Sequence, residues 1–226
     1  MKGVVLLSGG LDSVTLLHQA VKDLGAENVY ALTTNYGQKH SIEIEMAKWN
    51  CKKLKVQHKI LDISFLGDVV APVSTLVSNT DIAMPTIQDV LGDPQPPTYV
   101  PFRNLILHSI ALSFAESNGC EKVYLGIQAH DLYSYWDTTP DFMNAVNEVA
   151  KLNRHHLIMM DAPFVNLEKA DEIKIGLSLG VDYSKTWTCY TGPDKDGYAC
   201  GTCPSCAERR GAFKKLGMVD PVEYVR

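Results

Sequence analysis

The residues best suited to chemistry near the start of the chain form one short turn. It reads Ser8-Gly9-Gly10-Leu11-Asp12-Ser13 and lies between an apolar run ending at Leu7 and apolar residues at helical spacing. A glycine turn between a strand and a helix points backbone N–H groups toward an anion, and serine hydroxyls add donors for phosphate oxygens. We therefore predict that a nucleotide phosphate binds at Leu7, Ser8, Gly9, Gly10, Leu11, Asp12 and Ser13.

The turn matches neither of two common nucleotide-binding motifs. No Gly-Lys-Ser/Thr follows the glycines, as it does in a Walker A loop, and the spacing is not the G-x-G-x-x-G of dinucleotide-binding folds. One alternative stays open, a purely structural turn in which Asp12 or Ser13 caps the helix.

Four of the six cysteines crowd the last fifth of the chain. Cys200, Cys203 and Cys206 follow a Cys-x2-Cys-x2-Cys spacing, and Cys189 stands upstream of them. Four thiolates complete a tetrahedral zinc site with no open position, so the pattern predicts a structural zinc ion rather than a hydrolytic one. An iron–sulfur cluster and a set of unligated reactive thiols remain alternatives.

Strands and helices alternate along most of the chain. Apolar or alternating runs predict strands at residues 2–7, 29–34, 56–63, 122–127 and 157–160. Apolar residues at helical spacing predict helices at residues 13–24, 40–54, 105–116, 140–152, 166–179 and 207–216. This order is typical of parallel β-α-β units, so we expect an α/β fold with a parallel sheet and helices on both faces. The proline-rich residues 64–101 predict a long loop that acts as a lid or a mobile segment.

Composition narrows the class of protein. The chain has 226 residues, of which 46% are hydrophobic and 21% charged, which predicts either one large globular domain or one domain with a small appendage. We divide it into a nucleotide-binding domain, residues 1–185, and a cysteine-bearing segment, residues 186–226. The sequence has no apolar run long enough to span a membrane and no signal peptide, so we expect a cytoplasmic protein. A net charge of −5 without a basic block argues against polymeric nucleic acid as a partner.

The turn at Ser8 to Ser13 resembles that of the PP-loop ATP pyrophosphatases. In that class the motif S-G-G-x-D-S grips the β,γ-pyrophosphate of ATP while a substrate oxygen is adenylated. The resemblance implies ATP and Mg2+ as cofactors and the release of pyrophosphate. It also implies catalytic roles for Ser13 and for Asp12, which would contact the metal or orient the loop.

Four motifs in order resemble one branch of this class, the 7-cyano-7-deazaguanine synthase (QueC) family. They are Ser8 to Ser13, Asn35-Tyr36-Gly37-Gln38-Lys39-His40, Pro101-Phe102-Arg103-Asn104, and Thr186-Trp187-Thr188-Cys189-Tyr190 with the cysteine cluster. The likeness extends over essentially the whole chain. It implies a Rossmann-like domain of the HUP, or adenine nucleotide alpha hydrolase-like, type with a C-terminal zinc-binding element, and a homodimer.

The resemblance also suggests where ligands bind. Gln38 and His40 would contact the nucleotide, since they follow the second strand at the end where open α/β sheets bind ligands. Arg103 and Lys185 would serve as catalytic cations. Two alternatives stay open: Arg103 and Asn104 could form a surface pair, and His40 could be only a helix-start residue. The substrate-binding set is Arg103, Asn104, Asp131, Tyr135, Trp136 and Asp137.

Chemistry accounts for part of this set and leaves alternatives. A carboxylate at Asp131 or Asp137 can accept the paired N–H groups of a guanine-like edge, and Tyr135 or Trp136 can stack on its face. Both aromatic residues could instead belong to the core.

One segment departs from the family pattern. Trp136, Thr138 and Thr139 stand where proline, cysteine and arginine are expected, so a cation that could pair with a carboxylate is missing.

The leading hypothesis is ATP-dependent adenylation of 7-carboxy-7-deazaguanine followed by attack of ammonia, which gives the nitrile used in queuosine biosynthesis. A first alternative is a QueC-like ligase that stops at an amide or attaches the deazaguanine to a protein amine, as in antiphage systems of the CBASS type. A PP-loop tRNA-modifying enzyme and a nucleotide-sensing zinc module are further alternatives. The nucleotide-sensing module would bind ATP without releasing pyrophosphate, which distinguishes it from the enzymes.

Overall fold

Five parallel strands form a single sheet in the order β3-β2-β1-β4-β5. The computed structural model describes residues 1–93, 95–128 and 135–225. The strands are β1 (Gly3–Leu6), β2 (Val29–Asn35), β3 (Gln57–Asp62), β4 (Lys122–Leu125) and β5 (Met159–Asp161). The first strand in sequence is therefore the central strand of the sheet.

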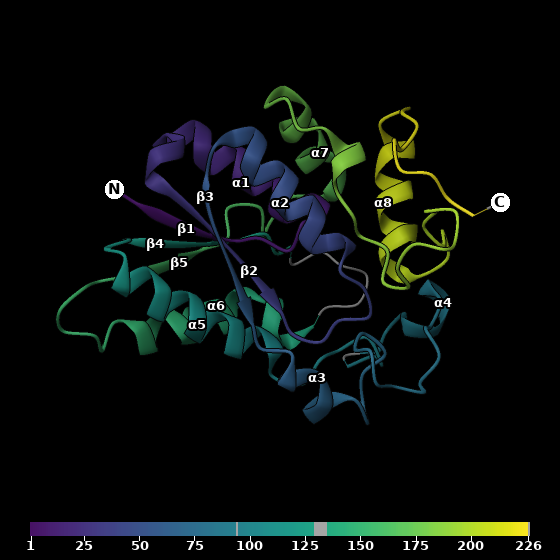
Figure 1. Cartoon of the computed structure of the whole chain (residues 1–226), viewed down its shortest axis with the longest axis horizontal. Helices are drawn as coiled ribbons and strands as arrows, with labels where there is room; N and C mark the ends of the chain where they lie inside the picture. The colour runs from purple at the N-terminus through teal and green to yellow at the C-terminus, as the bar shows by residue number, and fades with distance from the viewer. Residues whose placement is uncertain (94, 129–134, 226) are drawn as a thin grey trace.

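Helices cover both faces of the sheet, with α1, α2 and α7 on one side and α5 and α6 on the other (Figure 1). The α-helices are α1 (Leu11–Leu24), α2 (Ile42–Leu54), α3 (Phe65–Val70), α4 (Ile87–Val90), α5 (Arg103–Ser117), α6 (Pro140–Ala150), α7 (Lys169–Ser178) and α8 (Pro204–Lys215). Short 3-10 turns occur at η1 (Ala26–Asn28), η2 (Trp136–Thr138) and η3 (Tyr183–Lys185).

Successive side chains of β1 point to opposite faces of the sheet, so they belong to two separate apolar layers. Val5 packs in the layer under α1 and α7, whereas Val4 packs in the layer over α5 and α6, and both side chains are fully buried. A strand buried on both faces is uniformly apolar, as expected in a parallel sheet covered by helices. Leu6 pairs with Leu32 of β2 and with Leu125 of β4, so three strands end at the same edge. The predicted phosphate turn begins at this edge.

The α/β fold predicted from the sequence is confirmed, including the parallel sheet, the helices on both faces and the C-terminal group of four cysteines. Two details differ. Residues 64–101 contain the short helices α3 and α4 within an otherwise irregular segment, and the last helix begins at Pro204 rather than Ala207. Proline is well suited to the first turn of a helix, because its missing N–H has no partner there in any case.

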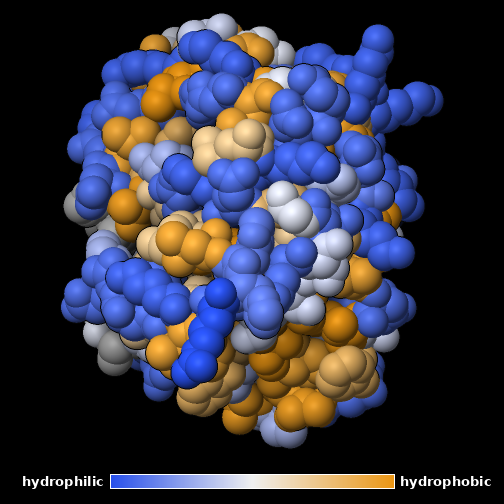
Figure 2. Space-filling view, turned by 90° about the vertical axis from the view of Figure 1, so that its left-hand side faces the viewer, coloured by the Kyte–Doolittle hydropathy of each residue, from blue (hydrophilic) through white to orange (hydrophobic). Residues whose placement is uncertain are grey.

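Several large apolar side chains stay exposed on α5 and α6 and just beyond them. They are Leu105, Val149, Leu152 and Leu157. Figure 2 shows apolar residues gathered in the lower part of one face, on the side where Figure 1 places α5 and α6. Within the described ranges, a membrane-spanning helix is not found.

Candidate functional site

A cavity of about 300 Å3 opens at the carboxyl ends of β1, β2 and β4. Its walls include Ser8 and Asp12 from the turn after β1, and Gln38 and His40 from the segment after β2. Arg103 of α5 lies opposite. Segments far apart in the sequence therefore meet at the edge of the sheet where open α/β folds bind ligands.

The turn after β1 is organised by its two serines. The Oγ atoms of Ser8 and Ser13 lie 2.9 Å apart, and Ser8 Oγ accepts the backbone N–H of Gly10 at 3.1 Å. Gly10 is the N-cap residue of α1, and no side chain caps the helix there. The 14-residue helix α1 therefore presents the free N–H groups of its first turn beside the cavity, which suits an anion.

Two glycines allow other elements to approach the turn closely. Gly9 has φ +91°, and a Cβ atom at this position would lie 2.0 Å from the carbonyl oxygen of Glu43 in α2. A Cβ atom at Gly126, after β4, would lie 2.8 Å from the backbone nitrogen of Ser13. Larger residues at these positions would push α2 and β4 away from the turn.

Lys169, at the start of α7, supplies a cation beside the turn. Its Nζ lies 3.2 Å from Asp12 Oδ1 and 3.7 Å from Glu208 Oε2 of α8, and its side chain is only 15% exposed. Sequence reasoning missed this residue, because a lysine at the start of a helix 157 positions from Asp12 looks like a surface charge. Its position fits a phosphate contact, and Asp12 and Glu208 hold it there.

Arg103 and Asn104 form a polar group on the opposite wall. Arg103 donates to Asn104 Oδ1 and to the hydroxyl of Tyr36, and its guanidinium lies 5.3 Å from the centre of the Tyr36 ring. Asn104 Nδ2 donates to the backbone carbonyl of Asp137 at 3.4 Å. Burial raises the pKa of the Asp137 carboxyl and nearby Arg103 lowers it, with a net rise. Arg103 is therefore a half-buried cation close to the buried acid Asp137.

The aromatic residues predicted to stack on a base separate in the structure. Tyr135 lines the cavity, and its hydroxyl lies 2.6 Å from Thr98 Oγ1. Trp136 packs edge-on against Phe102 and Phe142 and does not line the cavity. Asp131 lies outside the described residues.

The threonines that replace the expected cysteine and arginine also differ in position. Thr138 lines the cavity. Thr139 caps α6 instead, because its Oγ1 accepts the backbone N–H of Phe142 at 3.3 Å.

Of the remaining predicted site residues, some line the cavity and others do not. Leu7 and Gly10 line the cavity, whereas Gly9 and Leu11 are buried behind it. Lys185 is half-buried outside the cavity lining, and its carbonyl oxygen accepts from Asn50 Nδ2 at 2.7 Å.

Glu43 is an acid in the cavity wall that sequence reasoning did not single out. Burial raises its pKa to about 7, although Arg103 opposes the shift. Its neighbour His40 packs edge-on against Trp187, and burial lowers the pKa of that imidazole. Glu43 and His40 therefore place a carboxyl group and an imidazole among the residues that line the cavity.

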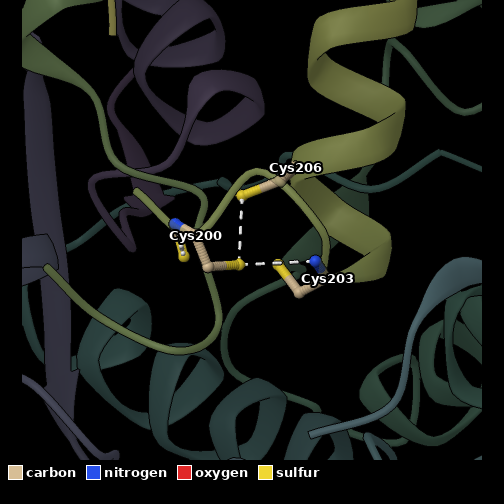
Figure 3. A group of neighbouring side chains, drawn as sticks. Cys200, Cys203 and Cys206 are labelled. Atoms are coloured by element: carbon tan, nitrogen blue, oxygen red, sulfur yellow. Dashed lines mark hydrogen bonds between the residues drawn. The ribbon is translucent and has the colours of Figure 1, made fainter. Parts of the chain in front are cut away.

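The four clustered cysteines fit a metal ion. Their sulfur atoms all lie within 4.8 Å of one another, and those of Cys200 and Cys206 are 4.0 Å apart. In a tetrahedral zinc site with Zn–S bonds of about 2.3 Å, sulfur atoms are about 3.8 Å apart. Figure 3 shows the thiols of Cys200, Cys203 and Cys206 pointing toward one another, and the N–H of Cys203 donates to Cys200 Sγ at 3.4 Å. Such donors stabilise thiolates, which are the form that binds metal.

Arg209 of α8 links several parts of the C-terminal segment through hydrogen bonds. It is 1% exposed and forms a bidentate pair with Asp220 at 2.8 and 3.0 Å. Its Nη1 donates to Thr186 Oγ1 and Thr188 Oγ1, and Nη2 also donates to the carbonyl oxygen of Tyr183. A buried arginine with five hydrogen bonds fixes the segment that leads to Cys189.

Known proteins resemble this chain over nearly its whole length. The family model of the queuosine biosynthesis protein QueC matches residues 2–217. The 7-cyano-7-deazaguanine synthase of Caldicellulosiruptor saccharolyticus is 44% identical over 224 residues, which cover 99% of this chain and 96% of that protein. The protein of the same name from Psychromonas ingrahamii is 42% identical over 223 residues, with 99% and 97% covered.

A more distant likeness is found among solved structures. The U34-tRNA thiolase NcsA from Methanococcus maripaludis, solved with its 4Fe-4S cluster, has a TM-score of 0.51 and 16% identity. The match covers 97% of this chain and 72% of that one, and it shows a shared fold.

Proposed function

The chain belongs to the QueC family of queuosine biosynthesis proteins, and on that premise we propose that it converts 7-carboxy-7-deazaguanine to 7-cyano-7-deazaguanine with ATP and ammonia. The relatives that carry the synthase name cover almost all of this chain, which favours the nitrile over the amide and the protein conjugate. Membership of this family makes the chain an enzyme of the queuosine pathway. The steps and residue roles below are our proposal.

The observation that carries the proposal is the pairing of two opposite walls in one cavity. The turn at Ser8 to Ser13 offers N–H groups and Lys169 offers a positive charge, which suit the phosphates of ATP. Arg103 offers a second cation on the other wall. A carboxylate held by Arg103 would face the α-phosphate of a nucleotide held by the turn.

The chemistry follows from the poor leaving ability of a carboxylate oxygen. That oxygen attacks the α-phosphorus of ATP, and the bond from this phosphorus to the pyrophosphate oxygen breaks. Ammonia then adds to the acyl carbon, loses a proton and expels AMP, which leaves the amide. Removal of the amide oxygen requires a second activation by ATP, after which AMP departs and the nitrogen has lost both protons.

Each named residue has a task in these steps. The N–H groups of the turn and Lys169 would stabilise the charge on the departing pyrophosphate. Arg103 would orient the substrate carboxylate, a task for which its planar fork is suited. With the family's usual arginine replaced by Thr139, which caps α6, Arg103 is the cation left on that wall among the described lining residues. Asp137 and Tyr135 would bind the heterocycle.

Two metal ions are part of the proposal. The cysteine cluster would hold zinc in a structural role, since its four thiolates leave no open position. Mg2+ accompanying ATP would reduce the charge on the phosphates, and Asp12 is the carboxylate best placed to contact it. Lys185 and Trp136 keep their predicted roles only as weaker candidates, because neither lines the cavity. The homodimer stays a prediction.

Mass spectrometry of the products tests the proposal. The protein is incubated with ATP, 7-carboxy-7-deazaguanine and ammonia, with and without candidate protein acceptors. We expect a nitrile, together with AMP and pyrophosphate, and loss of these products in Asp12→Asn and Ser13→Ala variants that keep their metal content. An amide as final product, a protein conjugate, or no pyrophosphate would each contradict the proposal.

A further inference from the structure

A serine between two of the clustered cysteines lines the cavity. Ser205 lies in the first turn of α8 and is 8% exposed. Its Oγ forms no hydrogen bond with any residue that the structure describes, yet this oxygen keeps accessible surface. A hydroxyl can donate one hydrogen bond and accept others, so Ser205 offers a donor that a ligand in the cavity can reach.

An ion pair shows that this face of α8 is turned toward the predicted phosphate turn. Glu208 follows Ser205 by three positions, and residues three or four apart share a helix face. Glu208 Oε2 lies 3.7 Å from Lys169 Nζ, and the same Nζ lies 3.2 Å from Asp12 Oδ1. The face of α8 that carries Ser205 is therefore joined to the turn through Lys169.

Thr188 connects the same face of α8 to the start of α1. Arg209 follows Ser205 by four positions, and its Nη1 donates to Thr188 Oγ1 at 3.2 Å. Thr188 lines the cavity, and its Cγ2 would lie 3.7 Å from a Cβ atom at Gly10, the N-cap residue of α1. Two independent contacts thus place Ser205 on the side of the cavity that borders the predicted phosphate turn.

This side of the cavity suits an anion that brings its own cation. Neither α1 nor α8 has a side-chain cap at its N-terminus, and uncapped N–H groups together with the helix dipole favour negative charge. Lys169 adds a positive charge between the two helices, but the carboxylates of Asp12 and Glu208 stand beside it. We therefore expect a phosphate ligand accompanied by a divalent cation rather than a bare anion.

We propose that Ser205 Oγ donates a hydrogen bond to the pyrophosphate part of ATP, so that the cysteine-bearing segment supplies part of the phosphate site. The inference rests on the proposed function, which brings the β- and γ-phosphates to the turn after β1. Cys203 and Cys206 flank Ser205 and so fix its position. The α-phosphate, which stays with AMP, has the same chemistry, and the experiment distinguishes the two.

The test compares variants that lack or keep the hydroxyl. Ser205→Ala removes it, and Ser205→Thr retains it. Binding of inorganic pyrophosphate and, separately, of AMP is measured by isothermal titration calorimetry on the full chain in the presence of Mg2+. Metal content and Tm are measured for every variant, and Ser205→Gly replaces the alanine variant if that one loses metal or does not fold.

We expect Ser205→Ala to weaken pyrophosphate binding by about tenfold and Ser205→Thr to stay within about threefold of the wild type, because a hydrogen bond to a charged group is lost only in the first. Affinity for AMP should stay the same in both variants. Thr202→Ala is the matched control, since Thr202 lies in the same segment but is exposed and does not line the cavity. Its pyrophosphate affinity should match the wild type.

Three outcomes would overturn the inference. They are unchanged pyrophosphate affinity in Ser205→Ala, an equal loss in a metal-loaded Ser205→Thr protein, and a loss confined to AMP. A wild type that does not bind pyrophosphate would overturn it as well. Failure of the proposed function gives a different pattern, in which the wild type forms no nitrile from 7-carboxy-7-deazaguanine while the pyrophosphate titrations still report on Ser205.

Discussion

The backbone N–H of Trp187 donates to the carbonyl oxygen of Gly9 at 3.0 Å. Gly9 belongs to the predicted phosphate turn, and Trp187 stands two residues before the first cysteine of the cluster. On the other side of the same turn, the α2 carbonyl of Glu43 packs against Gly9. The cysteine segment and α2 therefore hold the turn between them.

Loss of a metal ion from the four-cysteine cluster should weaken ATP binding at the predicted phosphate turn. Cys203→Ser removes one of four thiolates, and we expect lost metal, a Tm lower by roughly 10 °C and weaker ATP binding. Metal analysis, thermal melting and nucleotide titration check these outcomes. Cys51→Ala is the control, since Cys51 lies outside the cluster and burial raises its pKa to about 12. Unchanged ATP affinity in metal-free Cys203→Ser would argue against coupling through Trp187.

Arg209 should be essential for stability rather than for chemistry. Arg209→Met removes the positive partner of the buried Asp220 carboxylate, and breaking such a pair costs about 3–5 kcal/mol. The free energy of unfolding, measured in urea, reports this loss. Arg210→Met is the matched control, because Arg210 is exposed and its replacement should change stability by less than about 1 kcal/mol. Equal effects of the two variants would contradict the prediction.

Gly9→Ala should damage the turn more than a positive φ alone explains. The substitution requires both a strained φ of +91° and displacement of the Glu43 carbonyl. Gly92→Ala isolates the first cost, since Gly92 has φ +80° and no atom within 4 Å of an added Cβ. We expect about 1–2 kcal/mol for Gly92→Ala, a larger loss for Gly9→Ala, and weaker ATP binding only in the latter. Urea unfolding and nucleotide titration distinguish the two.

Lys169 should matter for pyrophosphate release. Lys169→Met removes a cation beside the turn and leaves Asp12 without its ion pair, so the rate should fall by about 100-fold. Lys174→Met, on the same helix, removes an exposed pair with Asp171 and should stay within about twofold. A pyrophosphate-release assay on both variants decides the matter, and similar rates would show that Lys169 is only structural.

His108 should make the protein sensitive to acid. Its pKa is about 4 in the folded chain and about 6.5 when exposed, so between these values the unfolded state binds the extra proton. The free energy of unfolding is therefore not reduced by His108 above about pH 6.5, and it falls as the pH drops toward 4. Two to three pKa units correspond to roughly 3 kcal/mol. Unfolding of the wild type and of His108→Leu at pH 4.5 and 7 should show this difference in slope, and parallel slopes would contradict it.

Local signals in the sequence were enough for the fold. Apolar runs and helical spacing predict all five strands of the sheet and most helices, because each element needs its own apolar pattern to be buried. The division at residues 185 and 186 stays a prediction. The turn after β1 could be predicted as a phosphate site because its glycines and serines are adjacent in the sequence, and that role stays a prediction.

The rest of the site depends on contacts that no local pattern encodes. Lys169, Glu43 and His108 reach the cavity from three different helices, and each looks like an ordinary helix residue in its own segment. Trp136 shows the opposite case. It adjoins a lining residue in sequence, yet it turns toward Phe102 and Phe142, where its large ring buries more apolar surface.

Because β1 is both the first strand in sequence and the central strand of the sheet, the ribosome synthesises the predicted phosphate turn long before the segments that surround it. Gly3 of β1 can pair with Lys122 of β4 only after more than a hundred further residues are synthesised, and Trp187, whose N–H bonds to Gly9, is synthesised later still. Translation adds about 5–20 residues per second, and parallel pairing between distant segments is slow to form. A nascent chain should therefore remain unable to retain ATP until almost the whole polypeptide has left the exit tunnel.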